Sequence, residues 1–276
     1  MSFAISSEID PVFCAIALRT VTDELARSAR RPGVDDTVQD ILPGLSEIAA
    51  RGRTLLANIL DARYPDVDWG GDEMERGLSS NTIDNCCWIY DPIDGAYHYI
   101  QGLPLWSASL ALVKNGEVVL GLVYDPTTNE MFTAQRGAGT TLNGQTISIS
   151  DKRVLRSAVV GTGLPIQGHG DPSVLAEAVA QLADISRKVF VVRQMASASL
   201  QLAYVAAGRL DAYWETGYDL HDWASGALLV REAGGCITDF EGQPFEQGGN
   251  GILAGPEHFV DSLRDSFFMP ATGELV

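Results

Sequence analysis

The stretch CWIYDPIDGAYHY, residues 87–99, carries the clearest information about the fold. Its first four residues are apolar and predict a buried strand, which Asp91 and Asp94 follow directly. Pro92 fixes the backbone angle φ and removes a hydrogen-bond donor, and Gly95 permits tight backbone geometry. The sequence therefore predicts a strand that delivers two carboxylates to a sharp turn, where both can reach one divalent cation.

A stretch of this kind is also an ordinary turn sequence, so it does not decide the function alone. Two further acidic segments accompany it, GGDE at residues 70–73 and ETGYDLHDWASGA at residues 215–227, which runs on to EAGG at residues 232–235. Together the three segments resemble the inositol monophosphatase family. In that family an acidic pair after a glycine, an Asp-Pro-Ile-Asp-Gly-Thr turn and a distal Trp-Asp-x-Ala-Ala helix start supply the ligands of a magnesium cluster.

Other strings similar to those of the family occur in the same order, so the resemblance runs from about residue 60 to about residue 256. They are ASLALV at residues 108–113, GLVYDP at 121–126, GAG at 137–139, LNG at 142–144, TGLP at 162–165 and AAGRLDAY at 206–213. This number of ordered matches argues against a chance resemblance.

The order of the predicted elements supports an α/β to α+β fold, and the resemblance implies a layered αβαβα sandwich of the sugar-phosphatase type. We expect an N-terminal half, residues 1–150, which carries the Asp-Pro-Ile-Asp-Gly turn. A C-terminal α/β half, residues 151–276, is expected to carry Asp222 and the wall of the substrate site. The two halves are expected to form one compact unit.

The spacing of apolar residues predicts a first amphipathic helix over residues 9–29, ended by RRPG at residues 30–33. A second helix is predicted over residues 45–62, and strands dominate residues 87–134. The apolar stripe of the first helix is expected to consist of Val12, Ile16, Ala17, Val21 and Leu25. The remaining predicted elements are strands at residues 158–161, 189–192 and 251–254 and helices at residues 173–183, 197–207, 222–233 and 256–266.

The composition is that of an acidic protein with a large core. The chain has 276 residues, of which 46% are hydrophobic, and a formal net charge of −17. This charge argues against nucleic acid as a partner, because a phosphate backbone is bound by clustered Lys and Arg. An acidic protein can still act on an anionic phosphate ester if divalent cations in its site invert the local field.

The location and the redox state also follow from the sequence. No apolar stretch approaches the roughly 18 to 20 residues that cross a bilayer, and the N-terminus lacks a basic start followed by an apolar run. We therefore expect a cytoplasmic protein with no membrane partner. The four cysteines are irregularly spaced, and Cys86 and Cys87 would point to opposite faces of a strand, so we expect reduced thiols.

The resemblance implies which residues hold the magnesium ions. Asp91 would bridge two ions, Asp94 and Asp222 would complete one site, and the backbone carbonyl of Ile93 would complete the other. Two ions about 3.5 to 4 Å apart can lower the pKa of an attacking water and neutralise the leaving oxygen of a phosphomonoester. Asp222 has a rival role as a helix N-cap, which Asp commonly fills, and the two roles do not exclude each other.

Asp72 aligns with a glutamate ligand of the family, and Glu73 beside it is either a helper of that ligand or the ligand itself. Taken alone, both residues would be read as part of a solvated loop. With Asp91 and Asp94 they make up the predicted catalytic set.

The substrate is expected to lie between the turn and the C-terminal half. Its phosphate would rest on the backbone N–H groups of Gly95 and Ala96 at the start of a short helix, where unpaired donors and the helix dipole favour an anion. Glu215 matches a family position that receives a substrate hydroxyl, and its alternative role is that of a surface strand residue. The other wall is expected to consist of Ala196, Ser197 and Ala198.

Two positions depart from the family pattern in a way that bears on turnover. This chain has Ala96 where the family has a threonine, and Ala49 where the family has an aspartate on the second helix. In the family that pair is proposed to orient and deprotonate the attacking water. Glu47 is a candidate substitute, but residues two apart on a helix do not face the same way.

The sequence thus predicts a Mg²⁺-dependent phosphomonoester hydrolase with weakened turnover, acting on a small polyol, sugar or nucleotide phosphate. The alternative is a family member that binds metal or a phosphorylated ligand in a regulatory role without hydrolysing it. The turn lacks the spacing of a calcium-binding loop and that of an aspartyl-phosphate nucleophile. Because the family commonly forms dimers, we expect a homodimer, with exposed aromatics around Tyr99 and Trp106 contributing to its interface.

Overall fold

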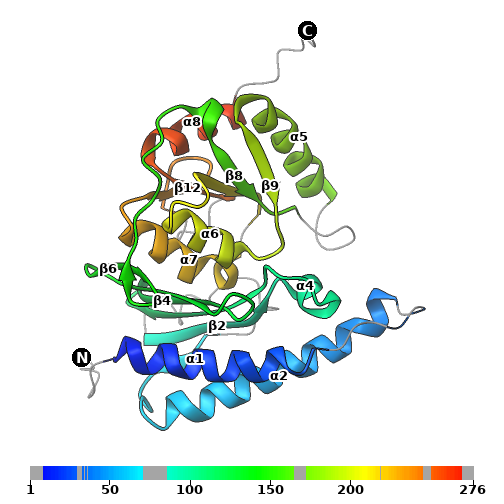
Figure 1. The fold of residues 1–276 in the computed structure, drawn as a ribbon, viewed down its shortest axis with the longest axis vertical. Coiled ribbons are helices and arrows are strands. Elements are labelled where there is room, and N and C mark those ends of the chain that lie inside the picture. The colour runs from blue at the N-terminus through cyan, green and yellow to red at the C-terminus, as the bar shows by residue number, and fades with distance from the viewer. Residues whose placement is uncertain are drawn as a thin grey trace.

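A computed structural model describes residues 9–29, 33, 35, 37–70, 86–164, 172–217, 219–244 and 250–268. Figure 1 shows that the helices and sheets stack in alternating layers. From the bottom of the view upward, the layers are α1 with α2, a first sheet, α6 with α7, a second sheet, and α5 with α8. The predicted layered αβαβα sandwich is confirmed. None of the described helices is long and apolar enough to span a membrane.

The outer layer of the N-terminal half consists of α1 (Pro11–Ala26) and α2 (Val38–Asp61). α1 begins where the carboxylate of Asp10 accepts hydrogen bonds from two backbone N–H groups of the first turn. α2 begins seven residues before the predicted start at residue 45, because Thr37 and Asp40 form a capping box there.

The predicted apolar stripe of α1 is wrong at two positions. Ala17, Val21 and Leu25 are buried, but Val12 is 67% exposed and Ile16 is 61% exposed. At about 100° per residue, these two side chains point to the opposite side of the helix from the buried three. The buried face is completed instead by Cys14, Leu18 and Thr22.

The first sheet is a meander in the order β1-β2-β3-β4-β5-β6-β7, in which only the short pair β1 and β2 is parallel among the described strands. Its central strands are β2 (Cys86–Asp94), β3 (Ser107–Lys114) and β4 (Glu117–Asp125). The others are β1 (Asp68–Trp69), β5 (Glu130–Gln135), β6 (Gly139–Leu142) and β7 (Gln145–Thr146). A short helix, α4 (Ala96–Gln101), follows β2 directly.

The second sheet is mixed and has the order β11-β12-β10-β8-β9. Its strands are β8 (Val159–Thr162), β9 (Val191–Gln194), β10 (Ala212–Glu215), β11 (Cys236–Thr238) and β12 (Ile252–Gly255). A single turn of 3₁₀ helix, η1 (Leu155–Ser157), precedes β8. The helices on its two faces are α6 (Ala198–Ala206), α7 (Leu220–Glu232), α5 (Pro172–Lys188) and α8 (Glu257–Phe268).

Three apolar cores hold the layers together. One lies between α1, α2 and the first sheet, the second surrounds α6 and α7 between the two sheets, and the third lies between the second sheet and α5 and α8. Alternate residues of β2 belong to different cores: Trp88 and Tyr90 face α1 and α2, whereas Cys87 and Ile89 face α6 and α7. This alternation directs the next odd residue, Asp91, toward α7.

The two aromatic residues expected at a dimer surface are buried instead. Tyr99 is 1% exposed and Trp106 is 6% exposed, and their rings pack edge to face with centroids 4.9 Å apart. The prediction of exposed aromatics at these positions is therefore wrong, and the exposed aromatic residue of α4 is Tyr97.

Candidate active site

Asp91 and Asp94 belong to β2 itself and not to a turn after it. The pairing of β2 with β3 shifts register between these two residues, which bends the strand and turns both carboxylates to the same side. Across Pro92, the N–H of Ile93 donates to Oδ1 of Asp91 at 2.9 Å. Gly95 then takes a left-handed conformation, with φ of 89°, and the chain enters α4.

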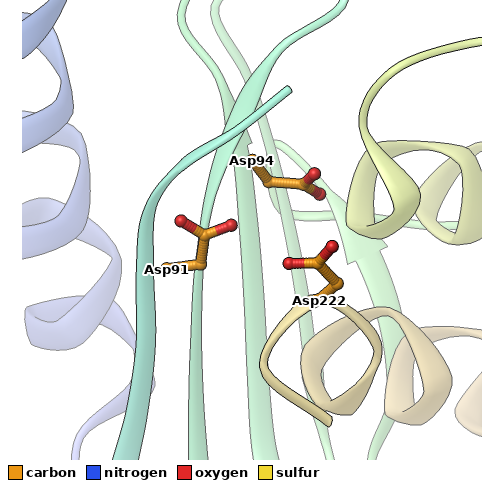
Figure 2. A group of neighbouring side chains, drawn as sticks. All are labelled: Asp91, Asp94 and Asp222. Carbon is orange, nitrogen blue, oxygen red and sulfur yellow. The ribbon is translucent and has the colours of Figure 1, made fainter. Parts of the chain in front are cut away.

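Asp222 comes from the first turn of α7. The N-cap of this helix is Asp219, whose carboxylate accepts from the N–H groups of His221 and Asp222 at 3.1 and 3.3 Å. The rival N-cap role for Asp222 is therefore wrong. Because Asp219 caps the helix, the carboxylate of Asp222 is left to face β2 (Figure 2).

Three carboxylates meet at this point. Asp91, Asp94 and Asp222 each offer an oxygen atom, and these oxygens all lie within 4.8 Å of one another (Figure 2). Asp91 and Asp94 are buried, and Asp222 is partly buried. Burial raises the pKa of Asp94 and, reinforced by the neighbouring carboxylates, raises that of Asp222 well above its ordinary value. Such a set of crowded hard oxygens fits a hard divalent cation, which would remove the repulsion.

A cavity of about 480 Å³ opens over these carboxylates. Most of the predicted site residues line it together, namely Asp91, Ile93, Asp94, Gly95, Ala96, Ala196, Glu215 and Asp222. Ser197 does not line it, because its Oγ donates to Oδ2 of Asp94 at 2.8 Å and caps α6. A second cavity, of about 460 Å³, lies between α1 and strands β5 and β6, and none of the described residues that line it carries a carboxylate.

Glu215 lies on the wall of the cavity, so the alternative of a surface strand residue is wrong. Its Oε2 accepts from Tyr213 Oη at 2.5 Å and from Trp223 Nε1 at 2.8 Å. Its Oε1 lies beside Gly163, where a Cβ atom would come within 2.5 Å of it. Burial raises the pKa of Glu215 from 4.5 to about 7.

The remaining predicted residues either lie outside the described part of the chain or are described and do not line the cavity. Asp72 and Glu73 lie outside the described residues. Ala49 is half-buried on α2 and Glu47 is exposed there, and neither lines the cavity. Of the two departures from the family pattern, only Ala96 contacts the cavity.

Several residues at the site were not expected from the sequence. His98, Gln194 and Met195 line the cavity. Ser199 Oγ donates to Oδ2 of Asp94 at 2.5 Å, and Ser107 Oγ lies 2.9 Å from Ser199 Oγ. The one signal for the serines is the Ser-x-Ser pattern at residues 197–199, which resembles nothing more than a helix start.

The layered sandwich with an acidic cluster between β2 and α7 defines a protein of the sugar-phosphatase type. The chain belongs to the inositol monophosphatase family, which matches residues 13–266. An inositol-1-monophosphatase from Rhizobium meliloti is 42% identical over 220 residues, which cover 79% of this chain and 80% of that protein. The Nus factor SuhB of Pseudomonas aeruginosa is 41% identical over 227 residues, covering 82% of this chain and 83% of that protein.

Solved structures agree with this assignment. The extragenic suppressor protein suhB from Bartonella henselae superposes with a TM-score of 0.79 at 30% identity, over 93% of this chain and 97% of that one. The inositol monophosphatase from Anabaena (Nostoc) sp. PCC 7120 also gives a TM-score of 0.79, at 25% identity, over 94% of this chain and 96% of that one. Membership of the family supports a phosphatase-like function, and the family is generally metal-dependent.

Proposed function

We propose that this protein is a magnesium-dependent phosphomonoester hydrolase that acts on a small polyol, sugar or nucleotide phosphate. The observation that carries the proposal is the convergence of Asp91, Asp94 and Asp222 at the floor of a cavity whose wall includes Glu215. The floor suits a cation and the wall suits a hydroxylated substrate. A homodimer in the cytoplasm remains part of the proposal, and light scattering tests the dimer.

The acidic residues would hold the metal. Asp91, Asp94 and Asp222 would provide carboxylate oxygens, and the backbone carbonyl of Ile93 and the side chain of Asp72 or Glu73 would complete the ligand set. When bound, Mg²⁺ supplies positive charge that activates a water and neutralises the leaving oxygen. Without such charge, the three carboxylates would repel a phosphate ester.

The substrate would be held at its two ends. The N–H groups of Gly95 and Ala96 would donate to phosphate oxygens, and the proposal is supported by the position of both residues in the cavity lining at the start of α4. At the other end, Oε1 of Glu215 is available for a substrate hydroxyl, because Tyr213 and Trp223 bond to Oε2. Ala196 offers an apolar surface between them.

The proposal includes weakened turnover. Ala96 brings no hydroxyl and Ala49 no carboxylate to the place where the family is expected to orient and deprotonate water. A positioned general base contributes about 10² to 10⁴ in rate. We therefore expect the protein to bind metal and substrate normally but to hydrolyse the substrate slowly.

A second candidate is a family member that binds metal or a phosphorylated ligand in a regulatory role and does not hydrolyse it. The substitutions at Ala49 and Ala96 favour it, and several relatives are named Nus factor SuhB and not as enzymes. For this chain, the acidic net charge still argues against direct binding of nucleic acid.

A phosphate-release screen separates the two candidates. Inositol phosphates, sugar bisphosphates and phosphoadenosine nucleotides would be offered to the full chain with Mg²⁺ and with EDTA, beside the variant Asp91→Asn. Release that requires Mg²⁺ and is lost in Asp91→Asn supports the hydrolase. Calorimetric binding of Mg²⁺ without release from any ester would support the binding protein. Equal Mg²⁺ affinity in wild type and Asp91→Asn, instead of a loss of about tenfold or ~1.4 kcal/mol, would remove Asp91 from the metal site.

A further inference from the structure

The two carboxylate oxygens of Asp94 have different surroundings. Oδ2 accepts three hydrogen bonds, from Ser197 Oγ at 2.8 Å and from the N–H and Oγ of Ser199 at 2.7 and 2.5 Å. Among the described residues, Oδ1 accepts only one, from the N–H of Ala198 at 3.3 Å. Donors therefore saturate one oxygen and leave the other available.

A third serine closes a ring of four oxygen atoms. Ser107 of β3 lies opposite Asp94 in the strand register, and its Oγ is 2.9 Å from the Oγ atoms of both Ser197 and Ser199. All three serines and Asp94 are buried. The ring thus joins β2, β3 and the N-terminus of α6 at Asp94, a member of the acidic cluster.

The number of protons fixes the direction of these bonds. Each hydroxyl has one proton to donate. When Asp94 is ionised, Ser197 and Ser199 both donate to its Oδ2. Ser107 then donates to one of these two serines and occupies an acceptor site on it. Ser107 therefore helps to hold one of these two hydroxyls in the orientation in which its proton points at Asp94.

This arrangement determines how Asp94 can meet a cation. A carboxylate can bind a divalent ion through one oxygen or through both. Three donors on Oδ2 occupy its acceptor sites and hold the carboxylate in one orientation, whereas Oδ1, with one hydrogen bond at 3.3 Å, still has a lone pair for a cation. Hydrogen-bond partners of metal ligands orient the ligand, and their removal typically costs about 10- to 100-fold in metal affinity.

We propose that Ser107 and Ser199 are positioning residues that commit Asp94 to bind a divalent cation through Oδ1 alone. The proposal rests on the metal-binding role proposed above for Asp94. Neither serine lines the cavity, so each acts through Asp94 and not on the substrate.

The test is a calorimetric titration of the metal-free full chain with Mg²⁺, and separately with Mn²⁺, in wild type, Ser199→Ala and Ser107→Ala. We expect Ser199→Ala to raise Kd about 10- to 100-fold. Ser107→Ala should have a smaller effect in the same direction, because the donors to Asp94 remain but are less firmly oriented. Ser107→Thr, which keeps the hydroxyl, should restore the affinity that Ser107→Ala loses.

A matched control removes a buried hydroxyl elsewhere. Thr22 of α1 is fully buried and donates to the carbonyl of Leu18 at 2.8 Å. Thr22→Val should lower thermal stability without changing Kd for either ion. At saturating Mg²⁺, the alanine variants at 107 and 199 should regain kcat with an unchanged KM, since every ligand is still present.

The outcomes separate this proposal from the proposed function. Unchanged Kd in both alanine variants, with clear metal binding by wild type, would overturn the positioning role and leave the metal site standing. A loss of affinity in Thr22→Val as large as in Ser199→Ala would also overturn it, because general loosening would then explain the effect. No binding of Mg²⁺ or Mn²⁺ by wild type would overturn both proposals.

Discussion

At the scale of single residues, Glu215 gives the site a group that titrates near neutral pH. Burial raises its pKa in the folded protein from 4.5 to about 7. Between these values the folded protein retains a proton that the unfolded chain releases, so the contribution of Glu215 to the free energy of unfolding falls as the pH rises from 4.5 to about 7. It is fully present below that window.

The variant Glu215→Gln tests this directly, because glutamine does not titrate. Urea unfolding of the metal-free proteins in EDTA, followed from pH 5 to pH 8, should show wild type losing stability relative to Glu215→Gln as the pH rises. The charge of Glu215 also helps to raise the pKa of Asp222, so the difference between the two proteins contains the titration of Glu215 together with its effect on Asp222. Parallel stability curves for the two proteins would contradict the raised pKa.

If the proposed function holds, we expect Ala49 and Ala96 to limit the rate of hydrolysis. The double variant Ala49→Asp with Ala96→Thr installs the family's groups. It should raise kcat by up to about 10²- to 10⁴-fold, the contribution of a positioned general base. KM should change little, because the new groups act on water in the transition state and not on the bound ester. Steady-state phosphate release measures both constants. A fast wild type with no gain in the double variant would show that another residue, Glu47 or Glu73 first, acts as the base.

The sequence allowed the acidic residues to be predicted but not their supports. Asp91, Asp94 and Asp222 stand in short motifs whose residue types suit hard cations, and the structure brings the three together. Ser199 is 105 residues from Asp94 in the chain, and the Ser-x-Ser pattern around it indicates only a helix start, so the sequence does not link the two residues. Tyr99 was misjudged for a similar reason: its hydroxyl donates to the carbonyl of Leu25 at 2.7 Å, a contact that only the packing of α1 creates.

At the scale of elements, α7 matters most because it carries Asp222 and lies between the two sheets. α7 approaches both α6 and strand β4 closely. A Cβ atom at Gly226 would lie 2.5 Å from Cβ of Leu202 on α6, and a Cβ at Gly121 of β4 would lie 2.7 Å from the carbonyl oxygen of Ser225. The lack of a side chain at these two glycines allows α7 to lie close enough to β2 for Asp222 to reach Asp91 and Asp94.

The variant Gly226→Ala should therefore destabilise the protein by about 1–3 kcal/mol, the usual effect of overpacking a core. It should also weaken Mg²⁺ binding, since a displaced α7 moves Asp222 away from β2. Gly44→Ala on α2 is the matched control, because its Cβ would meet nothing within 4 Å. There the higher helix propensity of alanine should stabilise the protein by about 0.5–1 kcal/mol. Urea unfolding measures stability and calorimetry measures Mg²⁺ binding. If both variants changed the free energy of unfolding in the same direction, the close packing of α7 against α6 would not be the cause.

Element types followed from apolar spacing, whereas element ends depended on interactions that the spacing does not contain. The periodic apolar pattern of α2 starts near Leu45, but the helix starts at Val38 because Thr37 and Asp40 cap it. The two-residue strand β1 and the three-residue strand β11 are too short for any period to show. They exist because a neighbouring strand, β2 or β12, offers them hydrogen bonds.

At the scale of the whole molecule, the acidic cluster joins parts that belong to different layers. Asp91 and Asp94 come from the first sheet, and Asp222 comes from the helical layer between the sheets (Figures 1 and 2). Three apolar cores hold these layers against the repulsion of the carboxylates. A cation in the cluster would convert that repulsion into an attraction between layers.

Added Mg²⁺ should therefore raise the midpoint of thermal unfolding. An ion bound only by the folded state stabilises it by about 2.7 kcal/mol at 100 times its Kd. For a chain of this length, that corresponds to a rise of roughly 5 to 10 °C. A sodium salt at the same ionic strength is the control for general screening, and differential scanning calorimetry is the measurement.

The variant Asp91→Asn tests whether this stabilisation comes from the acidic cluster. We expect it to be more stable than wild type in EDTA and less stable than wild type in Mg²⁺. In EDTA, the variant should melt above wild type, since it removes one buried negative charge from a crowded cluster while its Oδ1 can still accept from the N–H of Ile93. In Mg²⁺, it should melt below wild type, since it gains little from the ion. A variant that melts below wild type in both conditions by the same amount would show that Asp91 serves the fold alone. A variant that gains as much from Mg²⁺ as wild type would place the stabilising ion elsewhere on this acidic surface.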